Sequence, residues 1–371
     1  MVSSKEVHAF IRRDPVLFAS LVLALLSMLL VPPSAGYADY IDVRTLAILM
    51  CLMVSVAGIS STGAFDALAR GFLGRSRGIR SLVFVLVGLP FILSMFITND
   101  VALLTFVPFA ILVLTLAGRR DLLVPVTVLQ TLAANLGSML LPFGNPQNIF
   151  IASHYDVGLP DFVITTGVIV LVGAVVLVLM ALRVHDGPCE VSLADGQEGV
   201  DRRRLGFFTV LFAVCVLAVL RLVPYQFVLV LVVVLTLVVR PRTLVGIDWG
   251  LLLTFVFLFV FAGNLASLEA VSGSLGDLMR WDPVVASAVV SQFISNVPAT
   301  VMLSNFTEDW AGLLAGANIG GFGTPIASMA SIITLRIYSR EEDADRGRFL
   351  RFFMVTNVIM FVILLTASLI H

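Results

Sequence analysis

The sequence FITND at residues 96–100 interrupts an otherwise apolar stretch that runs from residue 81 to residue 117. A second polar run, FISN at residues 293–296, interrupts a matching apolar stretch in the other half of the chain. Polar side chains and irregular backbone are costly inside hydrocarbon unless they line a cavity or bind something. A polar run that occurs twice in such surroundings therefore indicates a binding site for a polar solute at mid-depth in a membrane.

The composition supports a membrane location for the whole chain. Hydrophobic residues make up 59% of the 371 residues and charged residues only 13%, whereas soluble globular proteins carry about 25% charged residues. Apolar runs at 16–31, 46–59, 162–182, 205–239, 251–262 and 352–370 are too many and too long for a signal peptide. We therefore expect an all-α polytopic protein of the plasma (inner) membrane.

The basic residues predict the orientation, because positive charge collects in cytoplasmic loops. When the predicted spans are followed alternately across the bilayer, 20 of the 23 Lys and Arg residues fall on one side, which leaves Arg44, Arg221 and Arg280 on the other. The N-terminus is therefore expected in the cytoplasm, and the C-terminus outside.

The two polar runs are the expected tips of two re-entrant hairpins, 81–117 and 283–306. The arms of the second hairpin, 283–294 and 297–306, would be about 18 and 15 Å long at a helical rise of 1.5 Å per residue. Neither arm can cross a hydrocarbon core of about 30 Å. The arms of the first hairpin are longer and leave two full spans possible, so there the internal repeat favours re-entry.

A segment interrupted by proline and glycine follows each hairpin. The segment 122–155 contains PFGNP at 142–146, and the segment 311–338 contains GGFGTP at 320–325. Proline removes a backbone hydrogen bond and breaks a helix, so each segment is expected to be a transmembrane helix with an unwound middle. Each half then has two spans, a hairpin, a broken span and a last span.

The predicted domain order places the first repeat at 1–184 and the second at 225–371. Four full spans return the chain to its starting side, so the second repeat is inverted only if one more helix crosses the membrane. Residues 205–224 supply this connecting helix, after a polar cytoplasmic linker at 185–204. Inverted repeats whose broken helices meet at the midplane are typical of secondary transporters.

Around the breaks the sequence resembles the ion transporter superfamily. This superfamily contains arsenite efflux permeases, sodium-coupled citrate and dicarboxylate carriers with citrate transporter-like domains, and some sodium/proton antiporters. The resemblance rests on GNPQN at 144–148 and GTPIAS at 323–328 and extends over about residues 41–370. The N-terminal half is one helix shorter than is usual in the superfamily.

The tips themselves depart in part from the superfamily pattern. In the carboxylate carriers both tips read Ser-Asn-Thr, and these side chains contact sodium or a carboxylate. Here the tips read TND at 98–100 and SNV at 295–297, so both asparagines carry over and the third position does not. The Asn-Asp pair of the first tip is similar to the arsenite permeases.

The resemblance implies an ion-coupled secondary active transporter that moves a small anion or oxyanion, arsenite-like or carboxylate, by an elevator-type mechanism. A sodium/proton antiporter of the same fold and an anion channel remain open alternatives. The expected partners are a small anionic or metalloid solute and the lipid bilayer, not nucleic acid, and a homodimer is left open. No cofactor is expected beyond sodium or protons as the coupling ion.

The candidate site needs no charged side chain for an anion, because interrupted helices present free N–H groups and free carbonyls side by side. The tip asparagines would bind an ion through their amides, although capping of the tips, packing at the kinks and bonds between helices are alternatives. The candidate binding residues are Thr98, Asn99, Asp100, Asn135, Gly144, Asn145, Ser295, Asn296, Thr300, Asn318, Gly323 and Thr324, and the candidate sodium ligands are Asn99, Asp100, Asn145 and Asn296.

An enzyme is not expected. An intramembrane protease would need a serine with a buried histidine, or two buried aspartates. The histidines lie near termini and segment ends without the spacing of metal ligands, and Asp100 has no acidic counterpart in the second tip. Four other acidic residues lie at span ends and are expected at the membrane interface: Asp66, Asp248, Glu269 and Asp277.

Overall fold

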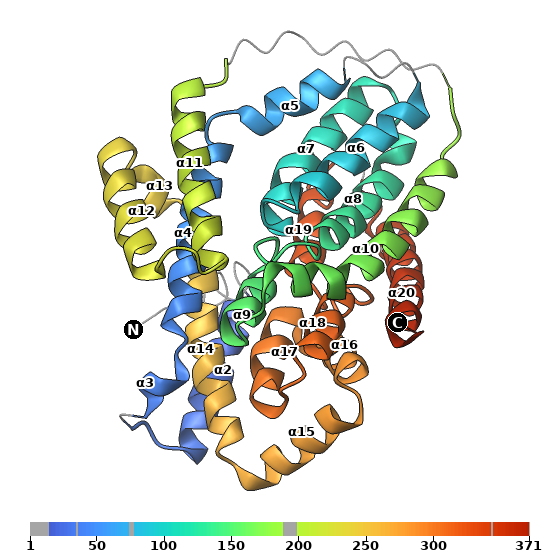
Figure 1. Ribbon diagram of the computed structural model, residues 1–371. Helices are drawn as coiled ribbons and strands as arrows, with labels where there is room; N and C mark the ends of the chain where they lie inside the picture. Colours follow the sequence, from blue (N-terminus) through green and yellow to red (C-terminus); the bar gives the residue numbers. More distant parts are fainter. Residues whose placement is uncertain (1–14, 35, 74–77, 188–198, 343, 371) are drawn as a thin grey trace, which may run out of the picture.

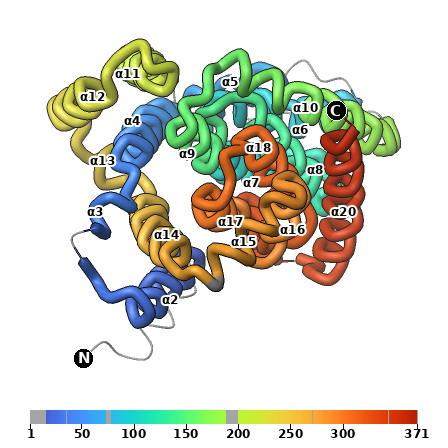
Figure 2. The backbone as a smooth tube through the Cα atoms, turned by 60° about the horizontal axis from the view of Figure 1, so that its bottom comes forward, coloured from blue at the N-terminus to red at the C-terminus, as the bar shows by residue number. Residues whose placement is uncertain are grey.

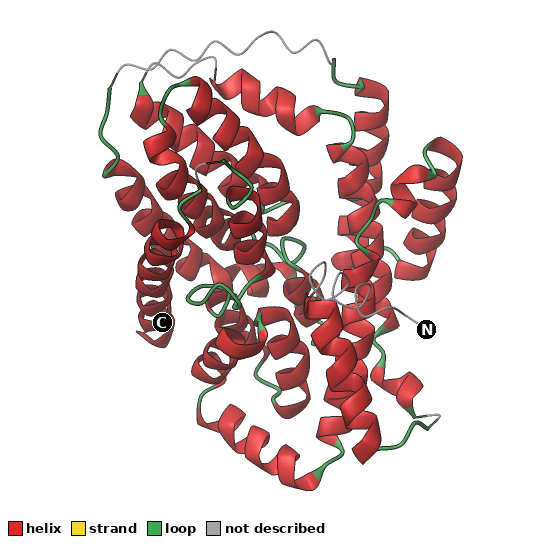
Figure 3. Cartoon of the chain, turned by 180° about the vertical axis from the view of Figure 1, so that it is seen from behind, coloured by secondary structure: helices red, strands yellow, loops and turns green. Residues whose placement is uncertain are grey.

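The computed structural model describes residues 15–34, 36–73, 78–187, 199–342 and 344–370. Most of the predicted linker at 185–204 lies outside these described residues. The described residues form helices and contain no β-strand (Figure 3). Five helices are long and apolar enough to cross a membrane by length and composition: α4 (Val43–Ser60), α7 (Asn99–Leu116), α10 (Leu159–Leu182), α14 (Trp249–Ala266) and α20 (Arg346–Ile370). These findings confirm the predicted all-α polytopic membrane protein.

The order of elements from α4 to α10 recurs from α14 to α20. The first half also contains α2 (Pro15–Leu30), α3 (Tyr37–Tyr40), α5 (Ala64–Leu73), α6 (Ile79–Leu93), α8 (Leu123–Gly137) and α9 (Pro146–His154). The second half also contains α11 (Arg202–Val219), α12 (Tyr225–Val239), α13 (Arg242–Val245), α15 (Glu269–Trp281), α16 (Pro283–Ile294), α17 (Asn296–Leu303), α18 (Trp310–Ile319) and α19 (Met329–Tyr338). The polar runs fall between α6 and α7 and between α16 and α17, and the breaks fall between α8 and α9 and between α18 and α19.

The helices form two groups (Figures 1 and 2). We name α2, α4, α11, α12 and α14 the frame group, in which α2 packs on α14, and α11 and α12 pack on α4. We name α6–α10 together with α16–α20 the centre group, which contains both hairpins and both breaks. The groups meet where α4 packs against α9 and where α14 packs against α17.

Two amphipathic helices lead from one group to the other. In Figure 1, α5 runs along the top from α4 to α6, and α15 runs along the bottom from α14 to α16. Both carry charged residues, among them Asp66 and Arg70 in α5 and Glu269 and Arg280 in α15. Such helices are suited to lie at a membrane surface with one apolar side inward. These two helices were not among the elements predicted from the sequence.

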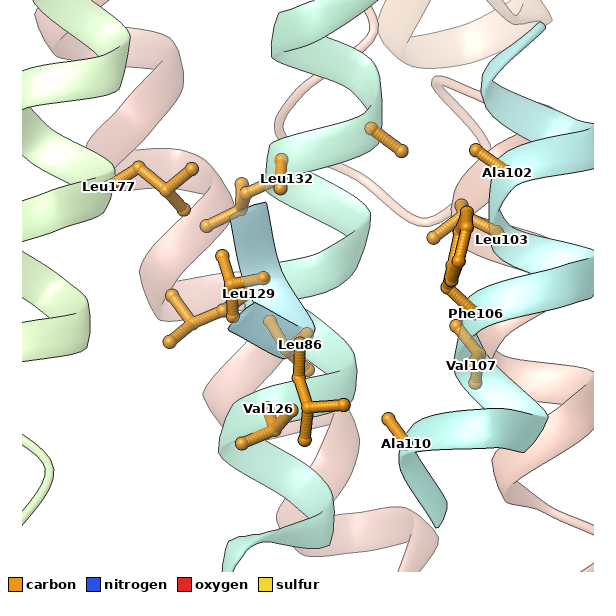
Figure 4. Packing of buried hydrophobic residues seen from close by; sticks show 14 of the residues in the cluster. Leu86, Ala102, Leu103, Phe106, Val107, Ala110, Val126, Leu129, Leu132 and Leu177 are labelled. Carbon is orange, nitrogen blue, oxygen red and sulfur yellow. The ribbon is translucent and has the colours of Figure 1, made fainter. Parts of the chain in front are cut away.

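Helix α8 lies in the middle of the centre group and is almost completely buried. Figure 4 shows Leu129 and Leu132 of α8 among the side chains of α6, α7 and α10. Pro90 in α6 has no N–H to offer to the carbonyl of Leu86. The buried Gln130 of α8 replaces it, because its Nε2 donates to Leu86 O at 2.8 Å and to Phe106 O at 3.2 Å. A proline inside a hairpin arm is thereby tolerated.

Candidate functional site

Asn135 connects the first tip to the second break. Its Oδ1 accepts a hydrogen bond from Asn99 Nδ2 at 2.9 Å, and its Nδ2 donates to Gly321 O at 3.3 Å. The Oγ of Ser328, at the start of α19, also donates to Asn135 Oδ1, at 3.3 Å. Asn99 and Asn135 are 5% and 4% exposed. Residues that are far apart in sequence therefore form one buried polar cluster.

The second tip reaches the same cluster. The backbone N–H of Asn296 donates to Ala327 O at 2.9 Å, directly before Ser328. A side chain at Gly321 would place its Cβ only 3.0 Å from Asn296 Nδ2, which shows how closely this amide approaches the break. Asn296 thus lies at the second break directly, and Asn99 is joined to this break through Asn135.

A second set of amides lies at the first break. Asn145 Nδ2 donates to Ser138 Oγ at 2.7 Å, and Ser138 Oγ donates to Asn135 O at 2.9 Å, which joins this set to the first. Asn318 of α18 donates to Asn148 Oδ1 at 2.8 Å. The Oδ1 atoms of Asn145 and Asn318 are buried and have no hydrogen-bond partner among the described residues. Gln130, Asn264 and Asn357 have such oxygens elsewhere, but those of Asn145 and Asn318 belong to one network at the break, where two of them could hold one ligand.

The two broken helices hold each other in a reciprocal way. Asn135 of α8 bonds to the second break, while Asn318 of α18 bonds to Asn148 of α9. The two asparagines occupy matching positions, because each lies two residues before a glycine at the end of its helix segment, Gly137 as the last residue of α8 and Gly320 as the C-cap of α18. The two halves therefore meet through a crossed pair of side-chain contacts at the centre of the protein.

Glycine is required at two of the candidate positions. A Cβ at Gly144 would lie 2.3 Å from Ser138 O, so the first break closes on itself there. Gly323 has a φ of +100°, and a Cβ there would lie 2.3 Å from Gln292 Oε1. Its neighbour Thr324 donates from its backbone N to Gln292 Oε1 at 2.9 Å and from its Oγ1 to Gln292 O at 3.0 Å.

The remaining candidates of the second tip differ in their contacts. Ser295 has a φ of 73° and a ψ of 152°, a conformation rare outside glycine that persists only where the surroundings impose it. Its Oγ donates to Ala327 O at 3.4 Å. Thr300 Oγ1 donates to Asn296 O within α17, at 2.7 Å, so this hydroxyl stabilises its own helix.

Four helices begin at this network, and none of them is capped by the side chain of its N-cap residue, although Asp100 N–H in α7 donates to Asn99 Oδ1 at 2.9 Å. Thr98, Asn145, Ser295 and Ser328 occupy the N-cap positions of α7, α9, α17 and α19, and none makes a side-chain cap. Aspartates cap α4, α11, α14, α16 and α18, while α6, α8, α10, α12 and α15 also lack a side-chain cap, so the four N-termini at this network differ from the others in lying together. Uncapped N-termini carry partial positive charge and attract anions.

The first tip borders a cavity of about 190 Å³ between the two groups of helices. Thr98 and Asp100 line this cavity from α7, across from Leu49 and Met53 of α4. The Oδ1 atom of Asp100 is buried and has no hydrogen-bond partner among the described residues. Asp248, at the exposed N-cap of α14, lines the same cavity. The cavity thus brings together two carboxylates from the two groups.

Sequence reasoning missed several residues of the site. Asn148 and Ser328 belong to the quoted motifs, so the motifs already contained the signal. Gln292 gave a weaker signal, a lone amide one helical turn before Asn296 in an apolar arm. Among the described residues, no group of three or more His, Cys, Asp or Glu side chains is placed to hold a metal ion.

The chain is similar to known transporters over most of its length. A family model described as citrate transporter matches residues 3–309. An uncharacterized transporter of Methanocaldococcus jannaschii is 30% identical over 340 residues, which cover 90% of this chain and 91% of the relative.

Two bacterial membrane proteins are also similar to the chain. The inner membrane protein YbiR of Escherichia coli is 32% identical, with 80% of each chain covered. A 46 kDa membrane protein of Mycobacterium leprae is 25% identical, with 80% of this chain and 79% of the relative covered. The predicted superfamily is confirmed by these matches, and the chain belongs to the citrate transporter family of the ion transporter superfamily, as a multi-pass membrane transporter.

Proposed function

We propose that the protein is an ion-coupled secondary active transporter of a small anion or oxyanion, either a carboxylate or an arsenite-like solute. The family model is described as citrate transporter, so citrate is the first carboxylate to test. The anion would bind among Asn99, Asn135, Asn296 and Ser328, where the tips and the second break meet.

The observation that carries the proposal is the contrast between the two kinds of helix end at this centre. The N-cap residues of α7, α9, α17 and α19 make no side-chain cap, and of the first N–H groups those of Asp100 and Asn296 are already bonded, to Asn99 Oδ1 and Ala327 O. The carbonyl groups at the breaks, in contrast, accept hydrogen bonds from the side-chain amides of Asn148 and Gln292. The partial positive charge therefore remains exposed to a ligand, while much of the negative charge is already neutralised.

The coupling ion would be sodium or a proton. The unpartnered amide oxygens of Asn145 and Asn318 suit sodium, a hard cation that takes oxygen ligands. Asn99 and Asn296 remain further candidate sodium ligands. Asp100 is suited to either ion, because its carboxylate borders the cavity and has a buried oxygen without a partner.

The frame group and the centre group meet at two boundaries, one closely packed and one open. This difference fits an elevator-type movement. In the repeat, the pair α4 and α7 corresponds to the pair α14 and α17. Helices α14 and α17 pack directly against each other, whereas α4 and α7 face each other across the cavity that reaches Thr98 and Asp100. We propose that the centre group slides along the frame group, so that the open boundary closes as the closed one opens.

A sodium/proton antiporter is the second candidate, and a specific observation favours it. Asp100 and Asp248 face one cavity, and two neighbouring carboxylates exchange protons and cations readily because both cannot easily stay charged. An anion channel would use the same site without alternating access. The protein would lie in the plasma (inner) membrane with a cytoplasmic N-terminus and an external C-terminus, and a homodimer remains a prediction.

Reconstitution into liposomes tests the proposal. Saturable uptake of citrate, a dicarboxylate or arsenite, driven by a sodium or pH gradient, is the expected result. Cation exchange without any anion flux would instead identify the antiporter, and flux that does not saturate would identify the channel.

A pair of variants links transport to the site. Asn99→Ala should reduce anion transport by about tenfold or more, since a buried polar partner of the ligand is lost. Asn357→Ala is the matched control, because Asn357 is also a fully buried asparagine but lies in α20 and bonds within its own helix. Equal losses in the two variants would contradict the proposed site.

A further inference from the structure

Gln292 fills the second break. Its Nε2 donates to Gly320 O at 3.0 Å, to Phe322 O at 2.9 Å and, within α16, to Ala288 O at 3.1 Å. A primary amide has two hydrogens, so three carbonyl oxygens share them. The carbonyl oxygens of Gly320 and Phe322 follow the C-terminal end of α18, which carries partial negative charge. Three such oxygens around one atom form a setting that a small cation would also satisfy.

The backbone is closed tightly around this amide. Thr324 N donates to Gln292 Oε1 at 2.9 Å. Gly323 adopts a φ of +100°, and any side chain there would come within 2.3 Å of Gln292 Oε1. The loop and the amide therefore leave no room for an ion between them, and a residue other than glycine would separate them.

At the first break Asn148 corresponds to Gln292, but the oxygens around it differ in their partners. Asn148 Nδ2 donates to Ser138 O at 3.0 Å and to Leu141 O at 3.4 Å, so a side-chain amide serves the carbonyls there too. Around it, however, the Oδ1 atoms of Asn145 and Asn318 remain without partners. Unpartnered oxygens are thus found at the first break, while at the second the amide oxygen of Gln292 is bonded.

We infer that Gln292 is a specificity-determining residue that occupies the place of a cation at the second break. This inference rests on the proposed function and makes it more specific. The second break and Asn296 then serve the anion through N–H groups, and a coupling sodium ion is confined to the first break, where Asn318 of the second half also presents its Oδ1. Gln292 acts by fixing the sign of the charge that the second break accepts.

Replacing Gln292 by glutamate tests the inference. An ionised carboxylate cannot donate to the three carbonyls and is repelled by them, whereas a protonated one donates a single hydrogen bond. In choline chloride, the melting temperature of Gln292→Glu should fall as the pH is raised. Sodium chloride of equal ionic strength should restore it at alkaline pH by about 3 °C more than it stabilises the wild type.

Gln130→Glu is the matched control. Gln130 is also buried and donates to two carbonyls, but these lie inside the first hairpin and away from either break. It should show no added sodium response. Gln292→Ala, which opens the same three carbonyls without adding charge, is the second variant, and a smaller sodium response is expected from it.

Two results would overturn the inference. One is a folded Gln292→Glu or Gln292→Ala protein with the sodium response of the wild type, and the other is an equal response in Gln130→Glu. The measurement uses purified protein with sodium and without any transported solute. It can therefore succeed or fail independently of whether the protein carries an anion.

Discussion

Arg221 forms an ion pair with Asp156 across the boundary between the frame group and the centre group. Both residues have a φ of 59°, in the left-handed region that non-glycine residues rarely adopt. Arg221 also donates from its guanidinium to Ser153 O at 3.0 Å. Next to Asp156, Tyr155 donates to Ser304 O and Thr307 O, each at 2.9 Å, so the turn after α9 is connected to the end of the second hairpin.

If the centre group slides along the frame group, this ion pair must separate during each cycle. A disulfide between Asp156→Cys and Arg221→Cys, in a background without the three native cysteines, should therefore reduce transport by about tenfold, and a reductant should restore it. The control is the pair Ser61→Cys and Arg240→Cys, which joins α4 to the end of α12 inside the frame group, where Arg240 donates to Ser61 Oγ at 2.9 Å. Full transport with the first disulfide closed would rule out the movement.

Gly323 should be the least replaceable glycine of the second break. Gly323→Ala combines a positive φ with a contact to Gln292 Oε1, so we expect the free energy of unfolding to fall by roughly 2–4 kcal/mol. Gly167→Ala in α10 is the control, because a Cβ there meets no atom within 4 Å. It should raise stability by roughly 0.5–1 kcal/mol, since alanine favours a helix. Thermal unfolding of the two purified variants decides, and equal melting temperatures would count against the closed loop.

The stabilisation of the protein by sodium should depend on the first break more than on the second tip. Asn145→Ala removes an unpartnered amide oxygen and should abolish the stabilisation of the wild type by sodium. Asn296→Ala should keep it, although anion binding weakens. The melting temperatures in sodium and choline chloride, without a transported solute, measure both effects. A sodium response that survives in Asn145→Ala and disappears in Asn296→Ala would reverse the assignment.

The local elements of this site could be predicted from the sequence, but the contacts between them could not. Prolines and glycines identified both breaks, and the polar runs identified both tips, because these signals are local. The bond from Asn135 to the second break depends on how the two halves pack, and no local pattern encodes it. For the same reason the sequence indicated a span end at Asp248 but not that this residue borders the cavity of Asp100.

Asp100 is the acidic residue that we expect to couple transport to a gradient. Its carboxylate has a buried oxygen without a partner and borders the cavity beside Asp248, so it is placed to take up a proton or sodium as the tip changes its surroundings. Val297, at the matching position of the second tip, can do neither.

Asp100→Asn should keep the fold and part of the anion binding but lose the dependence of transport on the pH or sodium gradient. Asp309→Asn is the control, because Asp309 caps α18 through Gly312 N at 2.9 Å and asparagine caps nearly as well. Gradient-driven transport in liposomes distinguishes the two variants, and unchanged coupling in Asp100→Asn would leave this residue only a role at the start of α7.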